Sequence, residues 1–348
     1  MTGQKTTTPV RRGWPDWVGY AAAGWAAGYA VLALVWTVTG RGYPFGPGDP
    51  DSIGPLRNLP ASIGAPLFAS GLVATAVAAL VMTGRARPAP PLRHALAGLG
   101  WLVAGVLLVV VPEVRVLALV GYAPMLILGA PFGWPPEVDY SEIFTWPLLN
   151  QAIAIAGGFL VAGTVLAWLR RTRGGCEACG RPGSARPDRW ARAAVAVAMA
   201  VPLLYAVTRF AWLVGIPLTI TDEFLAELHD SGAVWAGAGL GAFAVVGAVL
   251  TLGLVQRWGE RFPRWMVGLA GRRVPVSLAV VPAALVSVLV TSAGVGFLSH
   301  PDLFERLAVG EWILLPQLFW PVWGVALGAA IIAYQQRRRG RCPRCGRG

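Results

Sequence analysis

Charged residues are scarce in this chain. They make up 13% of the 348 residues, whereas hydrophobic residues make up 55%, and the mean hydropathy is +0.58. A soluble protein has about a quarter of its residues charged. The scarcity therefore excludes an ordinary soluble multidomain protein and indicates a polytopic membrane protein.

Motifs of the common soluble enzymes are also missing. The sequence contains no Walker loop, nucleophile elbow, His-Glu-x-x-His pair or dinucleotide fingerprint. Its three histidines, His94, His229 and His300, are too dispersed to form a metal set. These absences argue against an enzyme of the ordinary soluble type and leave no catalytic residue or organic cofactor to name.

A secretory signal is absent as well, so the first apolar run is expected to remain as a membrane helix. A hydrocarbon core roughly 30 Å thick requires about 20 apolar residues for each crossing. Eight stretches of that kind are present, at 17–39, 63–83, 95–117, 147–169, 193–215, 233–255, 275–297 and 312–334.

The charges are sorted between alternate loops. Of the 29 Lys and Arg residues, 24 lie in the N-terminal tail, the segments 84–94, 170–192 and 256–273, and the C-terminal tail, whereas 13 of the 17 acids lie in the other loops or adjoining helix ends. This positive-inside pattern predicts a bacterial inner-membrane protein with both termini in the cytoplasm. It explains the net charge of +12 without a nucleic-acid partner.

The segment between the third and fourth predicted crossings is irregular. Residues 118–130 are apolar but too few for a full span, and a Pro-rich, acidic stretch follows them. A ninth crossing would invert the charge pattern downstream. We therefore expect an interfacial or re-entrant element there.

Two stretches that follow apolar segments share one pattern. Trp168-Leu-Arg-Arg-Thr-Arg-Gly-Gly-Cys-Glu-Ala-Cys-Gly-Arg and Tyr334-Gln-Gln-Arg-Arg-Arg-Gly-Arg-Cys-Pro-Arg-Cys-Gly-Arg order an aromatic residue, a basic cluster and a Cys-x-x-Cys-Gly knuckle identically. This internal repeat predicts an all-α integral membrane fold, with eight transmembrane helices as two parallel four-helix repeats and a small cytoplasmic Cys-x-x-Cys crown. The predicted parts are a first repeat (1–173), a cytoplasmic linker (174–189), a second repeat (190–336) and a cytoplasmic tail (337–348).

Two motifs of the second half carry a family resemblance. Tyr205-Ala-Val-Thr-Arg209-Phe-Ala-Trp212-Leu-Val-Gly-Ile-Pro217, with the later Trp258-Gly-Glu-Arg-Phe-Pro-Arg-Trp265, resembles uncharacterised multi-pass membrane proteins of actinobacteria. The resemblance implies a topology and an origin. It carries over no functional residue, because that group has no assigned activity.

All four cysteines belong to the two knuckles. Cys176 and Cys179, together with Cys342 and Cys345, would supply the four thiolates of a tetrahedral structural zinc site if the repeat brings them together. The alternatives are a dithiol redox pair and unliganded or intermolecular roles. A structural disulfide does not suit a reducing cytoplasm.

Arg209 is the one charge placed well inside a predicted span. It either pairs with Asp222 or Glu223 or faces an internal cavity as part of an intramembrane functional site. Glu113 and Arg115, near an external helix end, favour a structural pair. Ten acids are predicted to lie outside. They would either bind a cation or provide acid–base groups at the outer surface, or they are there only because charge is sorted between the two sides. They are Glu137, Asp139, Glu142, Asp222, Glu223, Glu227, Asp230, Asp302, Glu305 and Glu311.

Three functions fit these features. The first is non-enzymatic transport of a small solute or ion along the axis between two repeats. The second is a membrane scaffold or a metal or thiol sensor, which would act through the Cys crown on a cytoplasmic protein partner. The third is a lipid-modifying enzyme that uses the external carboxylates.

Overall fold

The computed structural model describes residues 13–84, 88–132, 143–172, 188–262, 264, 266, 268–308 and 312–338. Within these residues the chain is helical, without β-strands, and eight helices are long and apolar enough to cross a membrane. The predicted number of spans and the helical class are thus confirmed. The spans are Trp14–Thr39, Ala61–Thr83, Pro90–Val110, Trp146–Thr172, Arg189–Leu213, Ala233–Leu252, Val276–Leu298 and Trp312–Arg338.

Large apolar side chains remain exposed on these helices. Val38 is 85% exposed, Trp235 71% and Val325 67%. Soluble monomers rarely leave extended apolar surfaces uncovered. The exposure is compatible with a lipid environment around the bundle.

The first group of helices packs through small residues. α1 (Trp14–Thr39) and α2 (Ala61–Thr83) lie along each other, and α6 (Trp146–Thr172) packs against α1 and α3 (Pro90–Gly105). Buried alanines let the α1 and α2 backbones approach closely, as membrane helices require when no hydrophobic effect drives them together. The alanines at this contact include Ala22, Ala30, Ala33, Ala65 and Ala69.

The second group follows the same packing order. α7 (Asp188–Leu213) lies along α9 (Ala233–Gly253), and α13 (Trp320–Arg338) packs on α7 and α10 (Val276–Leu298). Gly324 is required where α13 meets α10, because an added Cβ would lie 2.0 Å from Thr291 Oγ1. The predicted duplication would produce this shared order, but the duplication itself stays a prediction.

The third span ends earlier than expected. It was predicted at 95–117, yet α3 continues only through the π-helical turn η2 (Val106–Val110), and a new helix, α4 (Val114–Gly129), begins after a break. Pro112 has no N–H to continue the helical hydrogen bonds, and the Glu113 side chain is bound elsewhere. The apolar segment 118–130 thus lies mostly within a helix that starts at 114.

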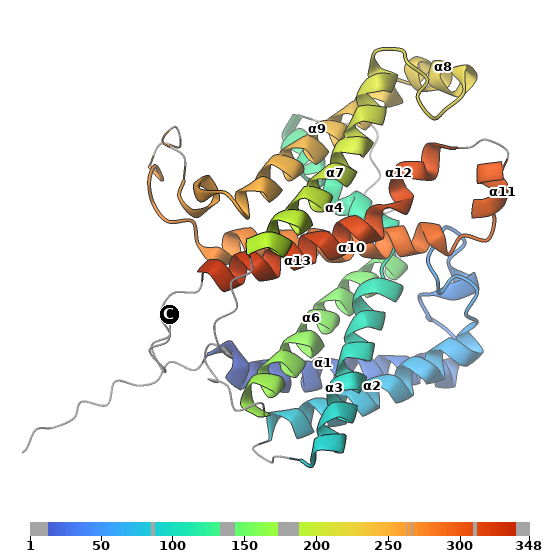
Figure 1. The fold of residues 1–348 in the computed structure, drawn as a ribbon. Helices are drawn as coiled ribbons and strands as arrows, with labels where there is room; N and C mark the ends of the chain where they lie inside the picture. Colours follow the sequence, from blue (N-terminus) through green and yellow to red (C-terminus); the bar gives the residue numbers. More distant parts are fainter. Residues whose placement is uncertain are drawn as a thin grey trace, which may run out of the picture.

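α4 connects the two groups. It packs on α10 and, more lightly, on α6, and α10 also contacts η2 (Figure 1). Ser292 of α10 donates a hydrogen bond to the carbonyl oxygen of Pro112 at the break. The contact between the groups is therefore built on the interrupted third span.

Shorter elements lie between the spans. α8 (Asp222–Asp230) and α11 (Leu303–Ala308) lie toward the same end of the molecule in Figure 1. The remaining short elements are η1 (Gly46–Gly48), η3 (Ala130–Phe132), η4 (Arg257–Glu260), η5 (Trp312–Leu314) and α12 (Leu315–Leu318).

Candidate functional site

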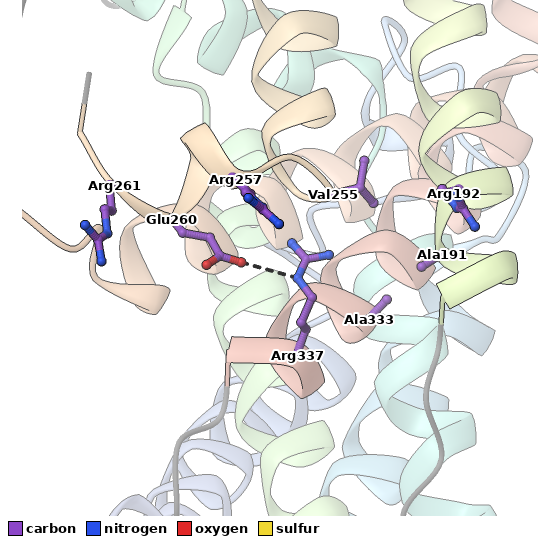
Figure 2. Close-up of a pocket in the computed structure, with 8 residues that line it drawn as sticks. All are labelled: Ala191, Arg192, Val255, Arg257, Glu260, Arg261, Ala333 and Arg337. Carbon is purple, nitrogen blue, oxygen red and sulfur yellow. Dashed lines mark ion pairs between the residues drawn. The ribbon is translucent and has the colours of Figure 1, made fainter. Parts of the chain in front are cut away.

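A cavity of about 750 Å³ lies between the first turn of α7, the segment after α9 and the last turns of α13 (Figure 2). We call it the arginine pocket. Four arginines and a single carboxylate line it, together with small or branched apolar residues. The lining is Ala191, Arg192, Val255, Arg257, Glu260, Arg261, Ala333 and Arg337.

Two contacts hold Arg337 in place. Its Nη2 donates to the carbonyl oxygen of Leu254 at 2.6 Å, and its Nε lies 3.4 Å from Oε1 of Glu260. Leu254 directly follows α9, so this arginine satisfies a backbone carbonyl at the end of that helix. One turn earlier in α13, the Tyr334 hydroxyl donates to the carbonyl oxygen of Gly259 at 3.2 Å.

Glu260 anchors the loop that carries Arg257 and Arg261. Its carboxylate Oε2 lies 3.8 Å from Nη1 of Arg338, whose Nη2 donates to the Val274 carbonyl oxygen at 2.5 Å. An antiparallel bridge between Arg261 and Arg273 closes the same loop. Because Glu260 is engaged by two arginines of α13, it orients Arg337 and leaves the pocket basic.

The pocket is suited to binding an anion. Arg257 and Arg261 form no ion pair with a described carboxylate, and Arg337 shares its only described carboxylate with Arg338. Guanidinium groups present planar, bidentate donors that match phosphate and carboxylate oxygens. The described lining contains no serine, cysteine or histidine that would act as a nucleophile or a general base.

A buried polar network at the opposite ends of the spans centres on Glu113, which is 1% exposed. Its Oε2 accepts hydrogen bonds from the backbone N–H groups of Ile53 at 2.8 Å and Gly54 at 3.0 Å, and from Ser52 Oγ at 3.2 Å. Its Oε1 accepts from Gln151 Nε2 of α6, also at 2.8 Å. A fully buried carboxylate is tolerated because every lone pair has a donor.

Arg115 supplies the countercharge in this network. It binds Glu113 through Nε and Nη2, and it binds Asp49 through Nη1, at 3.0 Å, and Nη2. Burial alone lowers the pKa of Arg115, but the hydrogen bonds and charges of Asp49 and Glu113 outweigh burial and raise this pKa above its ordinary value. Two carboxylates and one guanidinium thus tie the loop after α1 to the break before α4, as the predicted structural pair requires.

Arg209 lies in α7 among aromatic rings. Its guanidinium carbon is 4.6 Å from the ring centre of Tyr205 and 4.1 Å from that of Trp212, and its Nε is buried with no hydrogen-bond acceptor among the described residues. Cation–π contacts of this kind stabilise a partly desolvated arginine. It makes no ion pair with the described carboxylates.

Asp222 and Glu223 are exposed at the start of α8, whose Thr221 cap accepts from the N–H of Phe224 at 3.3 Å. A hydrogen bond with the Glu223 backbone, together with one from the Thr221 side chain, lowers the pKa of Glu223 below its ordinary value. Neither carboxylate pairs with Arg209 within the described part of the chain. An intramembrane site made by Arg209, Asp222 and Glu223 stays a prediction.

The histidines and external acids do not converge in the described segments. No group of three or more His, Cys, Asp or Glu side chains there is placed to hold a metal ion. His229 Nε2 lies 2.9 Å from the Trp212 carbonyl oxygen, and His300 Nδ1 lies 3.9 Å from Asp302 Oδ2. Glu137, Asp139, Glu142 and Glu311 lie outside the described residues.

All four cysteines, Cys176, Cys179, Cys342 and Cys345, also lie outside the described residues. The shared zinc site, the redox alternative and the cytoplasmic crown therefore stay predictions.

The arginine pocket was not identified by sequence reasoning. Its arginines were counted only as positive-inside charges. One feature of the sequence could have indicated the pocket: Glu260 is the single acid in the basic loop 256–273. The polar pair Asn150 and Gln151 inside an apolar span was a similar signal for the Glu113 network.

Comparisons with known proteins do not assign this chain to a family. The chain matches no family model, no curated protein and no solved structure.

Proposed function

We propose that this chain is a multi-pass membrane protein that binds a phosphate-bearing anion in the arginine pocket. The coarse part follows from the eight apolar helices, which are compatible with a polytopic membrane protein. The finer part depends on one observation. Arginines from three separate segments surround a cavity of about 750 Å³ that contains one carboxylate, itself bound by α13.

The energetics favour an anion over an empty or cation-filled pocket. Like charges around an anion-free cavity repel one another, but the four arginines of the lining are all exposed, so water screens this repulsion. A bound phosphate would instead be held by charge-assisted hydrogen bonds, each contributing about 1.5–3 kcal/mol before solvent screening. The cavity volume also falls within the range of small-molecule sites.

The pocket is proposed to face the cytoplasm. It lies at the ends of α7 and α13 that adjoin the Arg-rich segments 170–192 and 337–348. The positive-inside rule assigns such segments to the cytoplasmic side.

Of the three predicted roles, the pocket supports transport best. Transport is expected to need polar residues that face a cavity, and the arginine pocket is such a cavity, although the second group of helices lines it alone and it does not lie on an axis between the two repeats. The lipid-modifying enzyme requires converging external carboxylates, and those within the described residues form no group of three or more that could hold a metal ion. The scaffold or sensor depends on the cysteines and remains a separate proposal.

The test is anion-dependent stabilisation of the full-length protein in a non-ionic detergent. The thermal unfolding midpoint would be measured with inorganic pyrophosphate, with phosphatidylglycerol and with matched sodium chloride. We expect at least one phosphate-bearing anion to raise the midpoint because it binds the folded state alone.

The Arg257→Gln/Arg261→Gln double variant should lose most of that rise. The matched control is Arg272→Gln/Arg273→Gln, which removes two exposed arginines from the same loop but none from the lining. An equal rise in both double variants, or no rise in the wild type with either anion, would contradict the proposal.

A further inference from the structure

We infer that the ligand of the arginine pocket is the headgroup of an anionic phospholipid with two phosphate groups. The inference rests on the proposed function, which requires only that some phosphate-bearing anion binds. Three features of the pocket carry it, namely its depth, its apolar surroundings and its charge.

The position of the pocket along the spans corresponds to the level at which lipid phosphates lie in a bilayer. α7 begins at Asp188 and α13 ends at Arg338, so the pocket lies where two spans end. Trp190 and Trp258, 45% and 40% exposed, are sequence neighbours of pocket residues. Exposed tryptophans at span ends lie at the headgroup level of a bilayer.

The surroundings provide a surface for acyl chains. Ala191, Val255 and Ala333 form the apolar part of the lining. On the helices that adjoin the pocket, Leu250 of α9 and Ile332 of α13 are 62% and 53% exposed. A lipid would place its phosphates on the arginines and its chains along these helices, whereas a soluble anion would leave the apolar surface unused.

The charge favours two phosphate groups. Without Arg192, the lining contains three arginines, Arg257, Arg261 and Arg337, and one carboxylate, Glu260, which a second arginine of α13 also contacts. The excess is therefore at least two positive charges. A single phosphodiester carries one negative charge and would neutralise at most half of that excess, whereas two phosphodiesters in one headgroup would neutralise twice as much.

The experiment compares four additives on the full-length protein in non-ionic detergent. Cardiolipin has two phosphodiesters, phosphatidylglycerol has one, phosphatidylcholine has no net charge, and inorganic pyrophosphate has two phosphates without acyl chains. We expect cardiolipin to raise the unfolding midpoint most, phosphatidylglycerol less, and phosphatidylcholine and pyrophosphate not at all. Native mass spectrometry of the wild type should show cardiolipin retained after delipidation.

Arg257→Gln should weaken cardiolipin binding roughly tenfold or more, because one charge-assisted contact is lost. Arg272→Gln, which removes an equal charge outside the lining, should leave the affinity close to that of the wild type. Each variant is compared with its own lipid-free midpoint, so a general loss of stability does not affect the result.

The outcomes separate this inference from the proposed function. Stabilisation by pyrophosphate but not by cardiolipin would overturn the lipid assignment and leave anion binding intact. Equal effects of phosphatidylglycerol and cardiolipin would overturn the assignment of two phosphates. An absence of effect from all anions would overturn both proposals.

Discussion

At the scale of single residues, some buried polar atoms in this protein have hydrogen-bond partners and others have none among the described residues. The Glu113 carboxylate is fully hydrogen-bonded, whereas the hydroxyl of Tyr43 is buried without a hydrogen-bond partner in the described part of the chain. The Tyr43 ring packs edge-on against Trp36 and Phe45, with ring centres 6.0 and 5.6 Å apart. We therefore expect its ring to stabilise the fold and its hydroxyl to contribute nothing.

Replacement of Tyr43 with Phe tests this expectation. Removal of a buried hydroxyl without a partner should leave the free energy of unfolding unchanged or raise it by about 1 kcal/mol at pH 7. Equilibrium unfolding in mixed micelles measures the change. Tyr43→Ala is the control and should be clearly destabilising, because it removes the ring. A loss of stability in Tyr43→Phe comparable to that in Tyr43→Ala would reveal a partner for the hydroxyl.

The same residue predicts an alkaline pH dependence. Burial raises the pKa of Tyr43 from 10.0 to about 12. Between these values the unfolded chain loses the phenolic proton while the folded chain keeps it, so stability is fully present below pH 10 and falls toward pH 12. Unfolding midpoints measured from pH 9 upward should fall less steeply in Tyr43→Phe than in the wild type. Identical slopes would show that Tyr43 ionises equally in both states.

At the scale of elements, the interrupted third span organises the contact between the two helix groups. η2, the break and α4 all contact α10, and Glu113 at the break also binds the loop after α1. A continuous helix through Pro112 would direct Glu113 away from that loop. The break therefore positions the carboxylate that attaches the loop.

Glu113→Gln should weaken this attachment. The amide would place a donor where backbone N–H groups of Ile53 and Gly54 need an acceptor, and Arg115 would keep only Asp49. Loss of one partner from a buried pair costs about 3–5 kcal/mol, and we expect the lower end because Asp49 remains. The unfolding midpoint measures the loss, and trypsin should cleave faster after Arg57. The control Glu305→Gln changes an exposed acid of α11. Unchanged cleavage after Arg57 would show that the loop is held by other contacts.

At the scale of the whole molecule, the second group of helices places its basic and its acidic surfaces at opposite ends. The arginine pocket lies at one end, and α8, with its acids Asp222, Glu223, Glu227 and Asp230, lies at the other end of α7. This separation links the fold to the proposed function, because an anion would approach the pocket from the basic side only.

Cysteine labelling tests that arrangement in cells. In a background where the four native cysteines are serine, Asp230→Cys should react with a membrane-impermeant maleimide in intact cells, because α8 is expected outside. Arg272→Cys should react only after permeabilisation. Both positions are exposed in the structure, so access depends on the membrane alone. Labelling of Arg272→Cys in intact cells would place the pocket on the external side.

The sequence by itself determined the number of spans, the helical class and the sorting of charge between alternate loops. These properties are local, since hydropathy and loop charge depend on residues that are close neighbours in the chain. Only the tertiary structure decided which polar residues meet. Arg115 and Asp49 are 66 positions apart, Glu113 and Gln151 are 38 apart, and Arg337 reaches the Leu254 carbonyl oxygen across 83 positions. No local pattern encodes such contacts, because they arise when helices that are distant in the chain pack side by side. The break at Pro112 and the ends of α7, α9 and α13 therefore determine both polar sites.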